Sequence, residues 1–350
     1  MNILHLHDEP WDSGIAHYAV TLAAGQARRG HRVSFWARVG APAAACARAA
    51  GLQTREVGHP WLSLPFLRQA ARRERVELIN AHTGSSHSLG AALAAGTAAR
   101  LVRTCADARL PRGHALARAL ARRTSAYICA NSALAAHLRR SFPSARVALI
   151  PQGIAAPSPA ALPADPVVGL LGRLDPVKGH ETLLDAAALI RGRGLAVVLS
   201  FAGTGRLSQA LAALAKAKLP DGAALLRGRV ADPFAFIAGC RVGCVPSLGS
   251  EAVSRAALEW MSMGRPVVAS AVGGLPDLVE HGVTGLLVKP GDSTALADAL
   301  ERLLRDRDLC ERMGAAAGKR FQERFGLERF VSDTLDCYEG ALRAGTGAAA

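Results

Sequence analysis

A pair of glutamates, Glu251 and Glu259, lies within the stretch 246–290 with seven residues between them. Glu251 is expected in a Ser/Gly turn after a strand at Val242 to Pro246, and Glu259 about two turns into the following helix. Such a unit points backbone N–H groups and a helix N-terminus at whatever occupies the turn. Carboxylates accept hydrogen bonds from adjacent hydroxyls. The spacing therefore predicts a nucleotide-sugar site with Glu251 at its mouth and Glu259 deeper on the helix face.

A second candidate group lies upstream, in the sequence GRLDPVKG at 172–179. It follows the strand expected at Val167 to Leu171, and a turn there can hold Arg173 and Lys178 at a shared point. A guanidinium fork and an ammonium point charge together suit a diphosphate. The ordinary alternative for two such cations in a loop is surface charge.

These motifs, with the strand PVVAS and the run VGGLPDLVEHGVTGLLV, resemble the retaining nucleotide-sugar glycosyltransferases of family 4. The resemblance is specific from about 165 to 300 and weaker over 1–150. It implies the α/β fold called GT-B: two Rossmann-like domains with parallel sheets facing a cleft, and a C-terminal helix crossing back to the first domain. The expected divisions are an acceptor-side domain (1–152), a Pro-rich linker (153–166), a nucleotide-sugar domain (167–326), a crossover helix (327–343) and a flexible tail (344–350).

The resemblance also implies roles. The Arg and Lys matching Arg173 and Lys178 contact the donor diphosphate and stabilise it as it leaves, as preorganised charges do elsewhere. Glu251 matches the glutamate that contacts the donor sugar, and Glu259 the one that binds the ribose hydroxyls. A solvated helix carboxylate is the alternative for Glu259. The family usually has Gly-Phe-Gly where this chain has Ala252, Val253 and Ser254, so donor preference cannot be carried over; Ser254 could cap the helix or bind phosphate.

In the first half, Gly14 opens a helix after the loop beginning at Trp11, where the family has a glycine pair against the donor phosphate. His82 ends its strand as in the family. Many relatives have a histidine near Ala106; its absence leaves an altered sugar pocket, Asp107 standing in, or a weakened enzyme. Val230 lies in a turn near the expected base-binding wall, where plain turn chemistry is an equal interpretation.

A metal site is the other candidate in this half. His5, His7 and Asp8 could supply ligands, but a polar strand end is favoured because no third distant partner is evident. The predicted enzyme is metal-independent and needs no cofactor beyond its nucleotide-sugar donor.

The charge is divided unevenly. Residues 1–150 hold 20 Arg and 7 acidic residues, a formal charge of +13, whereas residues 151–350 carry +1. A one-sided positive charge predicts an anionic partner for the first half. Nucleic acid is disfavoured, because no recognition motif is present and aromatic residues make up only 5% of the chain. An anionic glycan, a lipid-linked acceptor or an anionic membrane surface remain.

The segment from Trp61 to Arg75 refines that choice. Large apolar residues precede Arg68, Arg72, Arg73 and Arg75, a combination typical of interfacial membrane-binding helices. An amphipathic helix packed on a sheet, with a solvated basic face, is the competing interpretation.

The overall pattern alternates strands and helices on both sides of a segment with five prolines between 151 and 166, which predicts two parallel sheets joined by a linker. No run approaches the ~20 apolar residues of a membrane span. The N-terminus does not resemble a signal peptide, and the seven cysteines lack metal-type spacing. We expect reduced cysteines and a cytoplasmic protein, with peripheral attachment to the cytoplasmic membrane face in the membrane alternative.

The favoured function is retaining transfer of a sugar to a lipopolysaccharide, lipid-linked or exopolysaccharide acceptor. A nucleotide-sugar epimerase of the same fold is disfavoured, because GRLDPVKG and the glutamate pair together belong to the transferases. A non-catalytic scaffold is the third possibility, suggested by the missing histidine and Gly-Phe-Gly.

Overall fold

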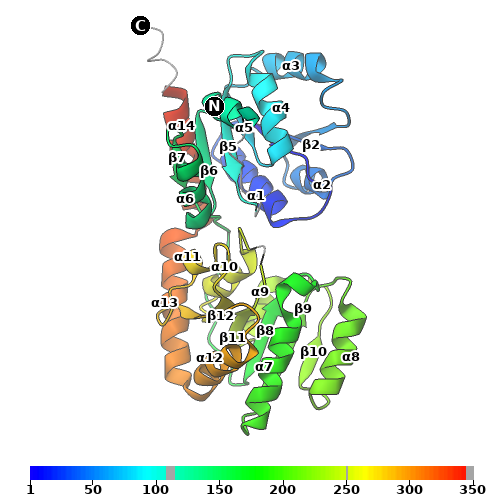
Figure 1. Cartoon of the computed structure of the whole chain (residues 1–350), viewed down its shortest axis with the longest axis vertical. Helices are drawn as coiled ribbons and strands as arrows, with labels where there is room; N and C mark the ends of the chain where they lie inside the picture. The colour runs from blue at the N-terminus through cyan, green and yellow to red at the C-terminus, as the bar shows by residue number, and fades with distance from the viewer. Residues whose placement is uncertain (108–114, 250, 344–350) are drawn as a thin grey trace. The chain divides into compact units, whose positions relative to one another are not determined.

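The computed structural model of the chain describes residues 1–107, 115–249 and 251–343, so the tail expected at 344–350 lies outside the described residues. The chain forms two compact units (Figure 1). Unit 1 contains residues 1–153 together with the segment that starts at Leu327, and unit 2 contains Ile154–Gly326. Each unit is built around its own parallel sheet.

The sheet of unit 1 has seven strands within the described residues, in the order β3-β2-β1-β4-β5-β6-β7. This order, in which the chain moves outward in both directions from β1, is that of a doubly wound sheet. Its strands are β1 (Asn2–His7), β2 (Arg32–Arg38), β3 (Gln53–Val57), β4 (Leu78–Ala81), β5 (Arg100–Cys105), β6 (Ala126–Cys129) and β7 (Val147–Leu149). Its helices are α1 (Gly14–Arg28), α2 (Pro42–Ala49), α3 (Leu64–Arg73), α4 (Gly84–Ala94), α5 (Ala115–Arg122), α6 (Ser132–Ser141) and α14 (Leu327–Arg343).

The two faces of this sheet carry different residues, because successive side chains of a strand alternate between faces. On β1, Leu4 and Leu6 belong to the apolar cluster formed with α3 and α4. His5 points to the other face, where it bonds Gln26 of α1. Helix α14 packs against α1, β5 and β6, and is drawn in red beside β6 in Figure 1. The C-terminal helix is therefore part of unit 1, although unit 2 separates the two in sequence.

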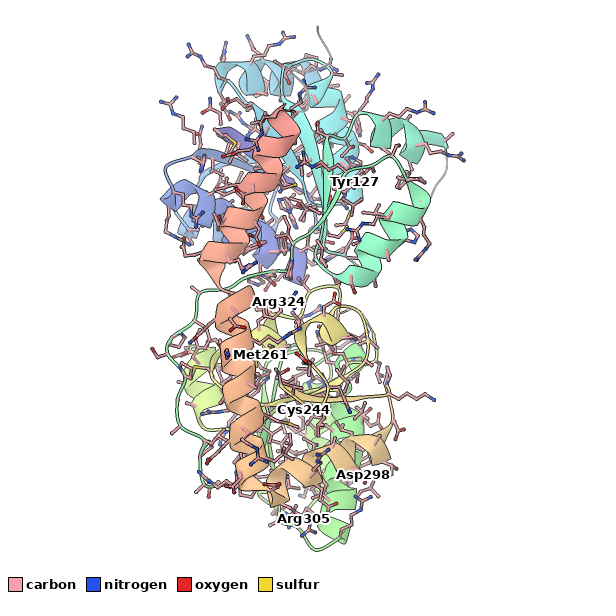
Figure 2. All side chains as sticks on the ribbon, turned by 90° about the vertical axis from the view of Figure 1, so that its left-hand side faces the viewer. Tyr127, Cys244, Met261, Asp298, Arg305 and Arg324 are labelled. Carbon is pink, nitrogen blue, oxygen red and sulfur yellow. The ribbon has the colours of Figure 1, made fainter. Side chains whose placement is uncertain are left out.

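Unit 2 has a six-stranded sheet in the described residues, in the order β10-β9-β8-β11-β12-β13. Its strands are β8 (Val167–Leu171), β9 (Val198–Ala202), β10 (Ala224–Leu226), β11 (Val242–Val245), β12 (Val267–Ser270) and β13 (Gly285–Val288). The helices are η1 (Pro176–Lys178), α7 (His180–Gly192), α8 (Ser208–Lys218), α9 (Pro233–Ala238), α10 (Arg255–Ser262), α11 (Leu275–Leu278), α12 (Ser293–Arg305) and α13 (Arg307–Arg324). Helix α10, which carries Met261, packs against the long helix α13 (Figure 2).

The Pro-rich segment expected as a linker contains no helix or strand, as its proline content predicts. It is nevertheless packed on unit 2, where Arg265 holds it in place. This guanidinium is fully buried and donates to the carbonyl oxygens of Ala160 (2.6 Å) and Ala161 (2.9 Å). It also donates to Ala238 (3.2 Å) and Met263 (3.1 Å). A buried arginine thus joins the segment to the body of the unit.

The α/β class and the two parallel sheets agree with the sequence prediction, and strands β1 and β12 match the expected spans. Two edge strands were not predicted. β3 has the sequence QTREV and is partly exposed, so it lacks the apolar run that marks a buried strand. β13 is only four residues long and is likewise an edge strand, at the end of the second sheet.

Two arginines of the α3 segment make hydrogen bonds to backbone carbonyl groups that the sequence did not predict. Arg68 donates to the carbonyl oxygen of Ala92 (2.9 Å), and Arg72 to that of Gly96 (2.7 Å). Both acceptors lie at the C-terminal end of α4, where carbonyl groups have no partner within the helix. These two side chains therefore join α3 to α4; Arg68 is half-buried, whereas Arg72 and Arg73 are exposed.

No helix within the described residues is long and apolar enough to span a membrane. All seven cysteines are free thiols, and six of them are buried, as expected.

Candidate functional site

The candidate site of unit 2 is formed by the loops that follow β8 and β11, which are neighbours in the sheet. Both loops leave the carboxyl edge, where ligands of such sheets bind. The N–H of Leu248 donates to the carbonyl oxygen of Val177 at 2.7 Å, which joins the two loops. Gly179 has φ +70°, and a Cβ there would lie 2.0 Å from the carbonyl oxygen of Pro246. Glycine is therefore required at the end of GRLDPVKG by both backbone conformation and space.

Lys178 and Glu251 meet at this junction. The ammonium Nζ of Lys178 donates to Oε1 of Glu251, and the hydroxyl of Ser247 donates to the same oxygen at 2.6 Å. Glu251 is only 1% exposed. The expectation that it lies at the mouth of the site is therefore wrong: its carboxylate lies inside, held by two donors. Because Lys178 keeps partial exposure, its ammonium is the part of the pair that a ligand can reach.

The backbone of Glu251 is fixed by the glycine pair of the VGGLPD sequence. The N–H of Gly274 donates to the carbonyl oxygen of Glu251 at 2.7 Å. Gly273 has φ +58°, and a Cβ there would approach the same oxygen to 2.3 Å. The two glycines thus allow the loop after β12 to lie directly against the glutamate, which explains why the motifs occur together.

Helix α10 is seated on the sheet by Trp260, which is fully buried. Strands β8 and β11 make room for its ring with Gly169 and Gly243, where an added Cβ would lie 2.3 Å and 2.4 Å from ring atoms. This contact sets the position of the neighbouring Glu259. Since α10 begins at Arg255, Glu259 is its fifth residue, just over one turn into the helix rather than two.

Glu259 is only 4% exposed, so the alternative of a solvated helix carboxylate is wrong. Its Oε1 accepts from Nε of Arg255 at 2.7 Å, across one turn of α10. Burial raises the pKa of the Glu259 carboxyl, and the positive charge of Arg255 opposes that rise. The arginine therefore helps to keep a buried carboxylate available as a hydrogen-bond acceptor.

Ser254 is the N-cap residue of α10, but its side chain makes no capping hydrogen bond in the described structure. The expected capping role is therefore not seen. Ser254 and Ala252 are buried, and Val253 is half-buried. Small side chains at these positions leave the start of α10 without a bulky group over its backbone N–H groups, which suits an anionic ligand.

Arg173 occupies a different position from Lys178. It is exposed, and the structure records no contact between the two cations among the residues it describes. The adjacent Gly172 contacts the turn at 203–205, since a Cβ on Gly203 would lie 1.8 Å from its carbonyl oxygen. The N–H of Gly203 donates to the carbonyl oxygen of Gly228 at 2.7 Å. Gly228 lies two residues before the half-buried Val230. The turns expected near the base-binding wall thus lie against the loop of Arg173.

The candidate residues of unit 1 lie at the carboxyl ends of β1, β4 and β5. Gly14 is the exposed first residue of α1. His82 is fully buried, and its Nε2 lies 2.9 Å from Nδ1 of His5. Asp107 lies 3.7 Å from the guanidinium of Arg103. No group of three or more side chains suited to a metal ion occurs among the described residues.

Buried histidines in this unit are held neutral. Burial lowers the pKa of His5 and of His7 to about 4, and that of His82 well below its usual value. His5 links His82 to Gln26 of α1 by hydrogen bonds of 2.9 and 2.8 Å. Nearby, Asn80 donates to the hydroxyl of Tyr338 on α14. These groups form a polar layer between the sheet and its covering helices.

Sequence reasoning missed Ser247, Arg255 and Trp260. The i, i+4 spacing of Arg255 and Glu259 on one helix was an available signal. Nothing in the sequence near Ser247 marks its bond to a residue four positions later. The role of Trp260 depends on glycines in two other strands, so only the packing reveals it.

Two family models match the chain, one for each half. "Glycosyltransferase Family 4" matches residues 13–156, and "Glycosyl transferases group 1" matches residues 165–306. A curated relative, the D-inositol 3-phosphate glycosyltransferase of Streptomyces griseus, is 36% identical over 204 residues. That match covers 52% of this chain and only 40% of the relative's length.

Solved structures share the whole fold. Alr3699/HepE of Anabaena in complex with UDP superposes with a TM-score of 0.85 at 21% identity, covering 97% of this chain and 100% of that one. The lipopolysaccharide outer core galactosyltransferase WaaB, in its apo form, gives 0.78 at 14% identity, with 99% of this chain and 100% of that one covered. At these identities the similarity establishes the fold alone.

Proposed function

We propose, since the chain belongs to the family 4 glycosyltransferases, that it is a retaining enzyme that moves a sugar from a nucleoside diphosphate sugar to an acceptor hydroxyl. The donor proposal is supported by the titles of the Anabaena structures, which name UDP and UDP-glucose as bound ligands. The acceptor we propose is a lipopolysaccharide, lipid-linked or exopolysaccharide chain. The name of WaaB supports the first of these.

The observation that carries the donor site is the joined pair of Lys178 and Glu251 at the carboxyl edge of unit 2. As the bond between the sugar and the β-phosphate breaks, negative charge develops on the diphosphate. A fixed ammonium stabilises that charge without reorganising, which is how preorganised donors lower a barrier. Glu251 fixes the ammonium of Lys178 by accepting its hydrogen bond. Ser247 fixes the Glu251 carboxylate in turn, because its hydroxyl donates to the same oxygen. Arg173, exposed on the same loop, is the second proposed contact of the diphosphate.

The remaining proposed donor contacts follow from the same loops. Buried Glu259 accepts from the ribose hydroxyls, and the charge of Arg255 opposes the rise in the Glu259 pKa that burial causes. The N–H groups at the start of α10, from Ala252 to Ser254, face an anion favourably because of the helix dipole. Two cationic side chains take the place that a metal ion has in other transferases, so we propose metal-independent catalysis.

The test is a thermal-shift screen of nucleoside diphosphates and their sugars, followed by donor hydrolysis and transfer assays. A donor present at 100 times its Kd should raise the unfolding free energy by about 2.7 kcal/mol. Binding of a nucleotide sugar that is then neither hydrolysed nor transferred would favour the scaffold alternative. Inversion of the donor's own stereocentre, with no transfer, would favour the epimerase.

For location, we propose that unit 1 attaches to an anionic membrane surface. Trp61 (58%), Leu62 (84%) and Phe66 (57%) are exposed at the start of α3, on the unit whose residues 1–150 carry a formal charge of +13. Exposed apolar side chains beside a basic surface suit the interface of an anionic bilayer. The apolar residues carry this proposal, because Arg68 and Arg72 are engaged with α4.

Vesicle binding tests the attachment. Replacing Trp61, Leu62 and Phe66 with Ser should abolish binding to anionic vesicles, and Arg73→Gln with Arg75→Gln should weaken it by about 1 kcal/mol per arginine. The matched control replaces two exposed arginines of unit 2, Arg302 and Arg312, with Gln. Binding should fall as salt rises, because screening acts over about 8 Å at physiological ionic strength. Binding to neither neutral nor anionic vesicles would indicate a soluble acidic acceptor instead.

A further inference from the structure

The loop between β1 and α1 is acidic, whereas the rest of the first 150 residues is mostly basic. Residues 8–13 have the sequence DEPWDS, where the family has glycines. Three of the seven acidic residues in the first 150 positions are in this loop, namely Asp8, Glu9 and Asp12. Trp11 lies among them and is 51% exposed. A loop that carries an exposed indole and three carboxylates stands out on a surface dominated by arginine.

The carboxylates are held in place by residues that begin the neighbouring helices. The hydroxyl of Thr83, the N-cap residue of α4, donates to Oδ1 of Asp8. The hydroxyl of Ser13, the N-cap residue of α1, donates to Oε2 of Glu9 at 2.6 Å. An ionised carboxylate offers about four acceptor positions, so a single internal donor leaves both groups able to accept from a ligand. The carboxylates of Asp8 and Glu9 are thus held in place but keep acceptor positions for a ligand.

A buried histidine points into this loop. His7, the last residue of β1, is 1% exposed, and neither ring nitrogen has a hydrogen-bond partner among the described residues. Its Nε2 lies 3.9 Å from Oε2 of Glu9, too far for a direct bond. A buried polar group without a partner is costly, by about 1–3 kcal/mol. A hydroxyl group that bridged Nε2 and the carboxylate would satisfy both.

We propose that this loop binds a sugar ring of the acceptor, neutral or amino-substituted, by stacking it on Trp11 and accepting its hydroxyl hydrogens at Asp8 and Glu9. The inference rests on the proposed glycosyltransferase function, since it names the acceptor of that reaction. Aromatic faces pack on the apolar C–H surface of a sugar, and carboxylates bind adjacent hydroxyls. His7 supplies the remaining contact at the Glu9 end.

The same loop selects against an anionic ring at this position. The carboxylates of Asp8 and Glu9 would repel a uronic acid or a phosphorylated sugar and attract an ammonium substituent, whereas Asp12 is paired with His17 at 3.0 Å. The arginines of unit 1 act over longer distances, attracting an anionic membrane or the rest of an acidic acceptor. The arginines of unit 1 thus attract anions over longer distances, whereas the carboxylates of the loop repel them on contact. In the proposal, the loop determines which sugar reacts.

The experiment measures saccharide binding by the full chain without any donor, using saturation-transfer NMR of the saccharide, because its signal does not depend on the tryptophan that Trp11→Ala removes. The probes are methyl α-glucoside, methyl α-glucosaminide and methyl α-glucuronide. The matched control is Trp61→Ala, because Trp61 is exposed to a similar extent (58%) on the same unit. Wild type and Trp61→Ala should bind the glucoside and the glucosaminide alike, and Trp11→Ala should bind them about ten-fold more weakly. Glu9→Gln should reduce the preference for the glucosaminide.

Equal affinity in Trp11→Ala and wild type, tighter binding of the glucuronide, or no binding of any probe at 100-millimolar scale would overturn the inference. Because no donor is present, the result is independent of the proposed activity. Trp11-dependent binding by a protein that turns over no nucleotide sugar would retain the sugar site and reject the glycosyltransferase. Turnover that Trp11→Ala leaves unchanged would retain the glycosyltransferase and reject the sugar site.

Discussion

The two units share an architecture but bury different kinds of polar group. Unit 1 places His5, His7 and His82 beneath its helices, and burial holds all three neutral by lowering their pKa values. Unit 2 buries the carboxylates of Glu251 and Glu259, each beside a cation. Both sets lie at or near the carboxyl edge of a parallel sheet, so position in the fold does not explain the difference.

The kind of polar group that each unit buries indicates what the unit can bind. A neutral polar layer provides hydrogen bonds and anchors α14, but it offers no fixed charge to a diphosphate. Paired charges cost desolvation energy, and they are worthwhile where a charged ligand must be met by a preorganised site. In unit 1 most charges lie at the surface, as arginines in general and carboxylates in the loop at 8–13, and the buried Arg103, 3.7 Å from Asp107, is an exception. The predictions below use this contrast.

The largest expected effect is on the stability of unit 2. Arg265→Ala should lower its unfolding free energy by about 3 kcal/mol or more, because several buried carbonyl oxygens lose their donor. Amide hydrogen exchange in β11 and β12, with urea unfolding, measures the loss. Arg305→Ala, a half-exposed arginine paired with Glu301, is the control and should cost at most about 1 kcal/mol. Equal destabilisation by both would mean that the Pro-rich segment is not anchored by Arg265.

The next effect is on catalysis. Lys178→Ala or Arg173→Ala should each lower turnover of the proposed reaction by about a hundredfold or more, because one preorganised donor to the leaving diphosphate is lost. Arg173→Ala should leave thermal unfolding nearly unchanged, whereas Lys178→Ala should lower the unfolding temperature as well, because the buried Glu251 carboxylate loses its cation. Lys216→Ala, an exposed lysine on α8, is the control. Near-normal rates in both single variants would show that Lys178 and Arg173 do not stabilise the leaving group.

A smaller effect is a difference between the two units in how their stability depends on pH. Histidines with a folded pKa of about 4 and an unfolded value of 6.5 stabilise the protein above pH 6.5, and lose that contribution as pH falls towards 4. Between pH 7 and pH 5 each should cost about 2 kcal/mol of unfolding free energy. Glu259 has the opposite sign, because its raised pKa favours the acid form in the folded state.

Hydrogen exchange at pH 7 and pH 5 should therefore show greater loosening of β1 and β4 than of β11 and β12. His5→Gln keeps a polar side chain without the titration and should reduce the loss in unit 1 by about 2 kcal/mol. Loss confined to unit 2, where burial also lowers the pKa of His180 to about 4, would contradict the contrast.

The smallest expected effect is that of chelation. If Lys178 and Arg173 act where other transferases use a metal ion, strong chelators should leave turnover within about two-fold of its starting value. The assay is sugar transfer with and without chelator. Complete loss, restored by manganese or magnesium, would show that the charges of unit 2 are not sufficient by themselves.

Much of the fold could be predicted because it depends on local patterns. Apolar runs separated by amphipathic helices predicted two parallel sheets, and the spans of β1 and β12 were right. Where an element lacks such a pattern the prediction failed, as for the partly exposed β3. The loop glycines of GRLDPVKG and VGG marked places where backbones approach closely, and Gly179 and Gly273 occupy such places.

Residue types and spacing alone determined which side chains the candidate donor site contains: Lys178, Glu251 and Glu259 are all buried or partly buried at one sheet edge or on the helix beside it. Only the tertiary structure decided their depth and partners. Glu251 is buried because Ser247, Lys178 and the Gly273 loop close around it, and Arg68 faces α4 because helix ends expose carbonyl groups. Such contacts join residues distant in sequence, and local periodicity carries no information about them.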